Sequence, residues 1–168
     1  MDVFQNVNAA YLNTASSETT ASPDRTIPSP LNIGIENSRR FRALPVYATL
    51  AAYGRDGYRD MLLRQISLSR AIARVLLESV DYELLPRAQP GTSAEARISS
   101  VYITVLFRAK DDTLNHDLTR RLNASRKLYI SGTQWRGQPA ARFAVANWQV
   151  AVKRDLEIVK EVLEKALS

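Results

Sequence analysis

The hydrophobic period of this chain changes close to Pro86, and this change limits the choice of fold more than any single motif. From about Asp56 to Ser79, the residues of one stripe recur at intervals of three and four, which predicts a long helix with one buried face. The stripe consists of Met61, Leu62, Gln65, Leu68, Ile72, Val75 and Leu76. Four arginines lie mostly off this stripe and are expected to form a solvated face: Arg59, Arg64, Arg70 and Arg74.

After Pro86, β-branched, aromatic and aliphatic residues dominate, which favours strands. The elements expected from residue 81 onward follow the order β-β-α-β-β-α. They are strands Tyr82–Leu85 and Ile98–Arg108, a helix Thr113–Ser125, strands Lys127–Thr133 and Ala140–Ala146, and a helix from about Gln149, with Gln89–Ala96 as a loop. This order predicts a small α/β domain of the α+β kind, with a mostly antiparallel sheet and helices packed on one face.

The part of the chain before the sheet divides into three segments. Residues 1–12 carry a few apolar side chains and are too short to fold alone, so they resemble the end of something larger. Residues 13–37 are rich in Ser, Thr, Pro and Asn without an apolar period, which predicts a mobile loop or linker. Residues 38–80 form a helical connection that Gly54 interrupts, with Pro45 in the first turn. Residues 81–168 then form the small domain.

Composition excludes several kinds of chemistry. The chain has no cysteine, which excludes disulfides, cysteine-based zinc sites, iron–sulfur clusters and thiol nucleophiles. Its single histidine, His116, cannot form a multi-histidine metal site, and we expect it to be solvated on the polar side of a helix. The six glycines form no phosphate-binding loop motif.

Charge and hydropathy indicate the environment. The formal net charge is +6, and no apolar run approaches the roughly 20 residues needed to cross a bilayer. The N-terminus lacks the features of a signal peptide, so we expect a cytoplasmic protein without a membrane partner. The strands lack the exposed aromatic pattern of an RNA-recognition sheet, so a nucleic-acid partner is not expected.

Two polar features interrupt otherwise ordinary patterns. The run Ser38-Arg39-Arg40-Phe41-Arg42 places three arginines in an expected first helical turn, where the helix dipole favours anions, and this suggests an acidic partner such as a carboxylate or a phosphate. Arg142 interrupts the apolar strand Ala140–Ala146. From the residues alone, Arg142 is either an edge residue that faces water or a buried carboxylate binder.

The order of five short motifs resembles the C-terminal part of group II pyridoxal-phosphate-dependent amino-acid decarboxylases, the relatives of aromatic-amino-acid, histidine, tyrosine and glutamate decarboxylases. The resemblance covers nearly the whole chain. Its motifs are Ile33-Gly-Ile-Glu-Asn-Ser-Arg-Arg-Phe-Arg-Ala-Leu, Tyr53-Gly-Arg-Asp-Gly-Tyr, Arg121-Leu-Asn-Ala-Ser, Tyr129-Ile-Ser-Gly-Thr and Ala141-Arg-Phe-Ala-Val-Ala-Asn. It implies the C-terminal part of the type I fold of pyridoxal-phosphate enzymes.

The resemblance also implies roles for three residues. Tyr11 resembles the tyrosine of the family's mobile catalytic loop, whose phenol acts as a general acid after CO2 leaves. Ser38 resembles a position beside both the cofactor and the substrate, where side-chain size tunes the choice of substrate. Arg142 resembles the arginine that holds the substrate carboxylate. For Tyr11 and Arg142 a purely structural role is the alternative.

The chain departs from the family in what it lacks. The Schiff-base lysine of a His-Lys motif lies upstream of the tyrosine loop in family members, whereas all five lysines here follow the loop and none is preceded by histidine. We therefore expect a C-terminal fragment that is inactive alone, with an amino acid as the substrate of the parent enzyme. As a partner, we expect a second copy or a full-length relative. The alternative is a non-catalytic binding or regulatory module, for example one that modulates a full-length decarboxylase dimer.

Overall fold

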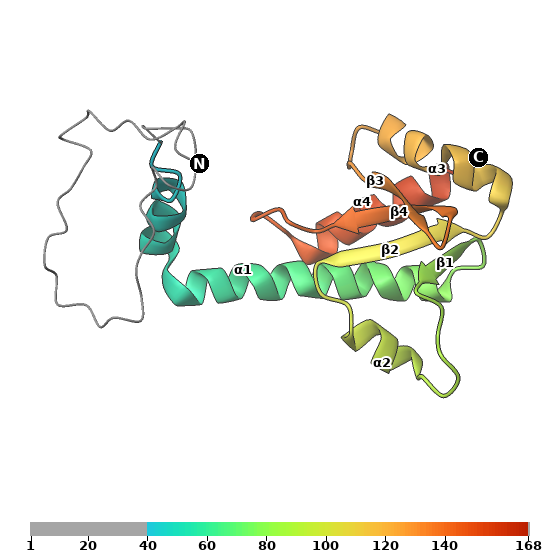
Figure 1. Cartoon of the computed structure of the whole chain (residues 1–168), viewed down its shortest axis with the longest axis horizontal. Helices are drawn as coiled ribbons and strands as arrows, with labels where there is room; N and C mark the ends of the chain where they lie inside the picture. Colours follow the sequence, from blue (N-terminus) through green and yellow to red (C-terminus); the bar gives the residue numbers. More distant parts are fainter. Residues whose placement is uncertain (1–39, 168) are drawn as a thin grey trace, which may run out of the picture. The chain divides into compact units, whose positions relative to one another are not determined.

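The computed structural model of the protein describes residues 40–167 (Figure 1). The chain divides into two units, residues 1–51 and 52–168, and only residues 40–51 of the first are described. Helix α1 (Leu44–Glu78) starts in the first unit and is interrupted at Gly54, whose φ of 61° and ψ of −173° suit glycine and almost no other residue. The predicted break at Gly54 is therefore confirmed.

The second unit is built around one antiparallel sheet of four strands in the order β1-β2-β4-β3 (Figure 1). The strands are β1 (Tyr82–Leu85), β2 (Thr104–Ala109), β3 (Ser131–Trp135) and β4 (Gln138–Ala144). The other helices are α2 (Ala94–Ser99), α3 (Asp112–Ala124) and α4 (Val152–Lys165). The register pairs Leu84 with Phe107 and Phe107 with Ala141, so these three side chains share one face.

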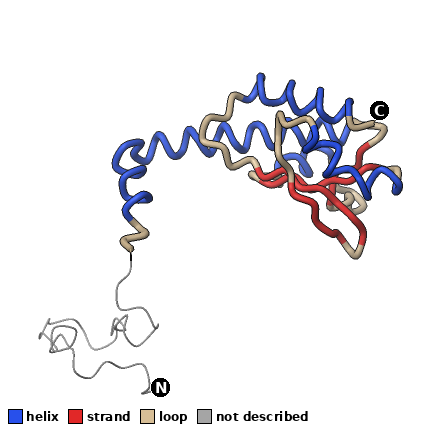
Figure 2. Tube along the Cα trace, turned by 90° about the horizontal axis from the view of Figure 1, so that it is seen from above, coloured by secondary structure: helices blue, strands red, loops and turns tan. Residues whose placement is uncertain are grey.

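That face carries the core, and Figure 2 shows most of the helical chain on one side of the strands. Strand residues that are buried against the helices include Tyr82, Leu84, Val105, Phe107, Ala141 and Phe143. The helices contribute Leu68, Ile72 and Leu76 from α1, Leu118 and Leu122 from α3, and Val159, Val162 and Leu163 from α4. The rings of Phe107 and Phe143 stack with their centroids 5.0 Å apart. The small mostly antiparallel sheet with helices on one face is thus confirmed.

Two predicted strands are partly wrong. The strand expected over Lys127–Thr133 begins only at Ser131 and runs on to Trp135. Residues 98–101 were expected to begin the strand that ends at Arg108, but Ile98 lies in helix α2 and the strand begins at Thr104. Ser93 caps α2 because its Oγ accepts a hydrogen bond from the N–H of Ala96 at 3.1 Å. The predicted loop also ends earlier than expected, since α2 begins at Ala94.

The arginines of α1 are not simply a solvated face, which corrects a second expectation. The Arg64 guanidinium donates to the carbonyl of Val150 at 3.1 Å, and Arg70 donates to the carbonyls of Val101 and Ser99 at 3.1 and 2.6 Å. Arg74 forms an ion pair with Glu95 of α2 at 2.8 Å. Arg70 and Arg74 thus hold α2 and the residues that follow it against α1, and Arg64 binds the segment that precedes α4. Arg59 is exposed, as expected.

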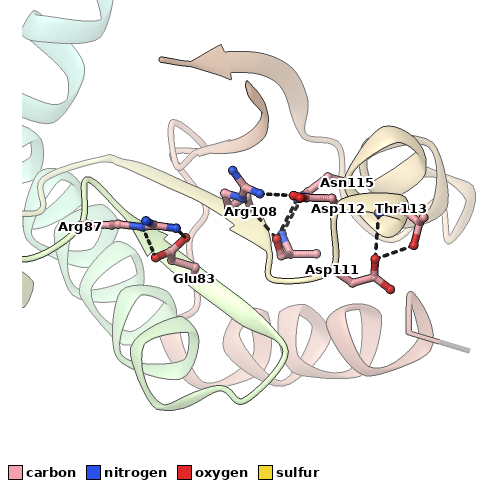
Figure 3. A network of polar contacts seen from close by, with 8 residues as sticks. Glu83, Arg87, Arg108, Asp111, Asp112, Thr113 and Asn115 are labelled. Carbon is pink, nitrogen blue, oxygen red and sulfur yellow. Dashed lines mark hydrogen bonds and ion pairs between the residues drawn. The ribbon is translucent and has the colours of Figure 1, made fainter. Parts of the chain in front are cut away.

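Two asparagines of α3 replace strand neighbours that the sheet lacks, and Figure 3 shows the first of them, Asn115. The Asn115 amide donates to the carbonyl of Ala109 at 2.8 Å and accepts from its N–H at 2.7 Å. Continuing the register between β2 and β4 places Pro139 opposite Ala109, and proline has no N–H to donate. Asn123 binds the backbone of Ile130 in the same way, at 2.8 and 3.0 Å. Helix α3 is thereby fixed to both strands that it connects.

Candidate functional site

The face of the sheet opposite the core carries the one predicted site residue that the structure describes. Arg142 lies in β4, an interior strand, where it pairs with Leu106 of β2 and with Ser131 of β3. Its side chain is exposed. Neither alternative drawn from the sequence fits fully, because Arg142 faces water from an interior strand rather than from an edge. Within residues 40–167 no hydrogen bond or ion pair engages its guanidinium.

An open groove of about 660 Å³ lies beside this face. It is formed by β1, the segment 86–92, α2 and the tip of the β3–β4 hairpin. Its apolar lining includes Leu84, Leu85, Pro86, Val101 and Trp135. Four arginines, Arg87, Arg97, Arg108 and Arg136, and one carboxylate, Glu83, also line it. This excess of positive charge raises the local concentration of anions.

Most of these arginines already have partners (Figure 3). Arg87 pairs with Glu83 at 2.6 Å, and Arg108 pairs with Asp112 at the start of α3. Arg97 donates to the carbonyls of Leu84 and Pro86 at 2.9 and 2.7 Å. These three arginines therefore mainly stabilise the walls of the groove. Arg136 differs, since its guanidinium stands 6.0 Å from the centroid of the Trp135 ring at the hairpin tip.

The lysines of the structure do not fit a covalent cofactor site. Lys110 donates to the carbonyl of Ser79 at 3.1 Å, and Lys127 pairs with Glu161 at 2.6 Å. Lys160 and Lys165 form ion pairs on the surface of α4, and Lys153 is exposed there. No lysine lines the groove. The described residues thus lack an amine in a site where a Schiff base could form.

Two of the predicted site residues, Tyr11 and Ser38, lie outside the described residues. The arginine cluster is described only from Arg40 onward, and it corrects an expectation. Helix α1 begins at Leu44, so Arg40 and Arg42 precede its first turn and do not lie within it.

Three other titratable side chains, His116, Tyr82 and Glu161, lie outside the groove. His116 is exposed on α3, as expected. Burial raises the pKa of Tyr82 to about 12, and its hydroxyl donates to the carbonyl of Leu163 at 2.8 Å. Hydrogen bonds from Lys127 and Lys165 lower the pKa of Glu161 to about 2. In the described part of the chain, no three acidic or histidine side chains gather as a metal site would need.

No helix within residues 40–167 combines the length and the apolar character that a membrane-spanning segment requires.

The groove itself was missed by the sequence analysis. Arg97 lies between the predicted loop and the predicted strand, Arg108 is the last residue of that strand, and neither carries a motif. A weak signal did exist, because the alternation in β2 places Arg108 on the face opposite Phe107. The sequence alone could not predict that Trp135 and Arg97 line the same groove, because that depends on the order of the strands in the sheet.

Comparisons with known proteins identify what this sheet and its sequence resemble. No protein-family model matches the chain. The aromatic-L-amino-acid decarboxylase of Sus scrofa is 28% identical over 113 residues, covering 67% of this chain and 21% of that protein. The 3,4-dihydroxyphenylacetaldehyde synthase of Drosophila melanogaster is 27% identical over 144 residues, covering 84% and 26%. The L-2,4-diaminobutyrate decarboxylase of Acinetobacter baumannii is 23% identical, covering 97% and 30%.

Solved structures share the fold. Catharanthus roseus tryptophan decarboxylase in complex with L-tryptophan matches with a TM-score of 0.62 at 18% identity, covering 81% of this chain and 28% of that one. Oryza sativa TDC with PLP and tryptamine matches with a TM-score of 0.63 at 20% identity, covering 80% and 28%. The chain is therefore similar to group II pyridoxal-phosphate-dependent decarboxylases, and it spans between about a fifth and a third of the length of the curated relatives above.

Proposed function

We propose that this chain is the C-terminal part of a pyridoxal-phosphate-dependent amino-acid decarboxylase, comprising the catalytic loop and the small domain. The observation that carries the proposal is Arg142, exposed at the centre of a sheet whose fold matches part of two tryptophan decarboxylases. An exposed guanidinium on an interior strand can meet a carboxylate brought by a substrate or by a neighbouring domain.

Arg142 would bind the substrate carboxylate. Its planar guanidinium can donate two parallel hydrogen bonds to the two carboxylate oxygens, which fixes both position and orientation. The neighbours Leu106 and Ser131 are only partly exposed, so they support the base of the side chain and leave its head free. Ser38 would lie beside the substrate and the cofactor, and its small side chain would leave room for a large substrate.

Tyr11 would supply the proton that replaces the departing carboxylate, because a phenol is a competent general acid when it is positioned over the reacting carbon. Pyridoxal phosphate, when bound, withdraws electrons from that carbon so that CO2 can leave. The described residues offer no lysine for this cofactor, so its covalent attachment would come from a sequence outside these 168 residues.

A second candidate is a non-catalytic module that pairs with a full-length decarboxylase. The first part of α1 favours it, because several large apolar side chains there are exposed: Leu44, Val46, Tyr47 and Leu50. Apolar side chains gathered in this way are typical of a surface that another chain covers.

The decarboxylase proposal is tested in a hybrid enzyme in which this chain replaces the matching part of the Sus scrofa aromatic-L-amino-acid decarboxylase. We expect Arg142→Ala to raise the Michaelis constant about tenfold or more, since a charge-assisted bidentate contact is lost. Arg142→Lys should not restore it, because an ammonium group cannot reproduce the contact.

Release of CO2 is the measurement, and Arg120→Ala is the matched control because Arg120 is an exposed arginine of α3 that pairs with Asp117 of the same helix. A folded hybrid that binds pyridoxal phosphate but releases no CO2 would contradict the proposed function. If Arg142→Ala leaves the Michaelis constant unchanged, the role of Arg142 is wrong.

A further inference from the structure

The two edges of the sheet differ in how their backbone groups are satisfied. In an antiparallel edge strand, alternate residues direct their N–H and C=O groups inward to the neighbouring strand, and the residues between them direct these groups outward. An edge with free outward groups is a template for another strand. The edges of this sheet are β1 and β3.

Side chains occupy part of the β1 edge. Lys110 N–H donates to the carbonyl of Asp81 at 2.7 Å, which makes Asp81 an inward residue and Tyr82 and Leu84 outward ones. The N–H of Tyr82 donates to Ser79 Oγ at 3.1 Å, and the carbonyl of Leu84 accepts from Arg97 at 2.9 Å. Another strand could add to β1 only by displacing these contacts.

The β3 edge is closed at one end only. The turn between β3 and β4 consists of Arg136 and Gly137, both with positive φ, which is the geometry of a two-residue hairpin closed by an inward pair at Trp135 and Gln138. Counting back from Trp135, the outward residues are Gln134, Gly132 and Ile130.

Asn123 satisfies both backbone groups of Ile130. Within residues 40–167, by contrast, no group binds the outward N–H or C=O of Gly132 or Gln134. The structure therefore leaves a short open edge on β3, between the Asn123 clamp and the hairpin turn.

We propose that this open edge pairs with the same edge of a second copy of the chain, antiparallel and centred on Thr133. In that register Gly132 lies opposite Gln134 of the second copy, and Gln134 lies opposite its Gly132. Each of these two pairs exchanges two backbone hydrogen bonds, so all four outward groups on each copy are satisfied. Pairing ends at Ile130 on one side and at Arg136 on the other, because Ile130 is already bound and Arg136 lies in the turn.

The residues of β3 favour a second copy over an unrelated strand. Residues 131–135 contain no charged side chain and no proline, the devices that usually protect an edge. The two-fold axis places Thr133 opposite itself and Ser131 opposite Trp135, with no like charges facing each other. The interface is small, so the dimer should be weak and depend on concentration. This inference uses only the sheet and is independent of the decarboxylase proposal.

The test changes the residue on the axis. Thr133 is exposed on the face away from the core, so a charged side chain can be placed there without disturbing the fold. Two lysines or two glutamates would face each other across the axis, and we expect Thr133→Lys and Thr133→Glu each to weaken the dimer about fivefold. An equimolar mixture of the two variants should restore association, because opposite charges then face each other.

Sedimentation equilibrium of the full chain at concentrations up to about 1 mM gives the dissociation constants. Thr104→Lys is the matched control, because Thr104 is also an exposed threonine on the open face but lies on interior strand β2. Amide hydrogen exchange should show protection of Gly132 and Gln134 that rises with concentration. A wild-type chain that stays monomeric, a dimer indifferent to charge at Thr133, or a mixture that fails to associate would each overturn the proposal.

Discussion

At the scale of single residues, the side chain of Asn115 contributes more to the stability of the fold than its polar character suggests. It is buried on α3, and it is bonded to both backbone groups of Ala109 at the end of β2. We expect Asn115→Ala to lower the free energy of unfolding by about 2–4 kcal/mol, because two buried backbone groups lose their partner. Urea unfolding followed by circular dichroism measures the change.

His116→Ala is the control for Asn115, because the neighbouring His116 is exposed on the same helix and should change stability little. Asn115→Asp separates the two hydrogen bonds, since a carboxylate can accept from the Ala109 N–H but cannot donate to its carbonyl. If Asn115→Ala and His116→Ala unfold at the same urea concentration, Asn115 does not have this role.

Single residues also show what the sequence could and could not predict about the site. Arg142 could be singled out because a charge in an apolar strand is visible in the sequence, although its exposure on an interior strand was not foreseen. The arginines of the groove could not, because their roles depend on tertiary neighbours. Arg97 donates hydrogen bonds to carbonyls 11 and 13 residues away, and no local sequence pattern predicts such a contact. Tyr11 and Ser38 remain predictions from resemblance.

At the scale of elements, α2 protects the edge strand β1 through Arg97. This side chain joins the short helix to the carbonyls of Leu84 and Pro86. We expect Arg97→Ala to destabilise the fold by about 1–3 kcal/mol, because the buried carbonyl of Leu84 loses a charged donor. Hydrogen exchange should rise in β1 and α2 before it rises in β4.

Arg87→Ala provides the comparison for Arg97, because Arg87 is an exposed arginine paired with Glu83, four residues earlier in the chain, and its loss should change stability little. Equal losses of stability in the two variants would show that the contacts of Arg97 with the backbone contribute nothing beyond an ordinary surface ion pair.

The helices and strands also show where the hydrophobic period of the sequence was sufficient to predict secondary structure. Tyr82–Leu85 was predicted with its observed ends, because a short apolar run before proline has few other structures. The segment around Ile98 was not, because Ile98 and Val101 are β-branched and a six-residue helix is too short to show a helical period. The missed signal was Ser93, a helix cap with Glu95 in the first turn.

At the scale of the whole molecule, the positions of the lysines decide whether a polypeptide of these 168 residues forms a covalent adduct with pyridoxal phosphate. A covalent adduct needs an uncharged amine held in a site that also binds the phosphate and the ring. The described lysines lie instead on the surface, and Lys127, Lys160 and Lys165 form ion pairs with glutamates there. We therefore expect no stoichiometric adduct when pyridoxal phosphate is added to the purified polypeptide.

Absorbance titration followed by borohydride reduction and peptide mass spectrometry tests this expectation, with the hybrid enzyme as the positive control. Weak labelling spread over several lysines is the expected background, because free pyridoxal phosphate reacts slowly with any exposed amine. One lysine labelled to completion at an equimolar ratio would contradict the prediction. It would mean that the chain holds its own cofactor site, and the proposal that attachment comes from another sequence would fail with it.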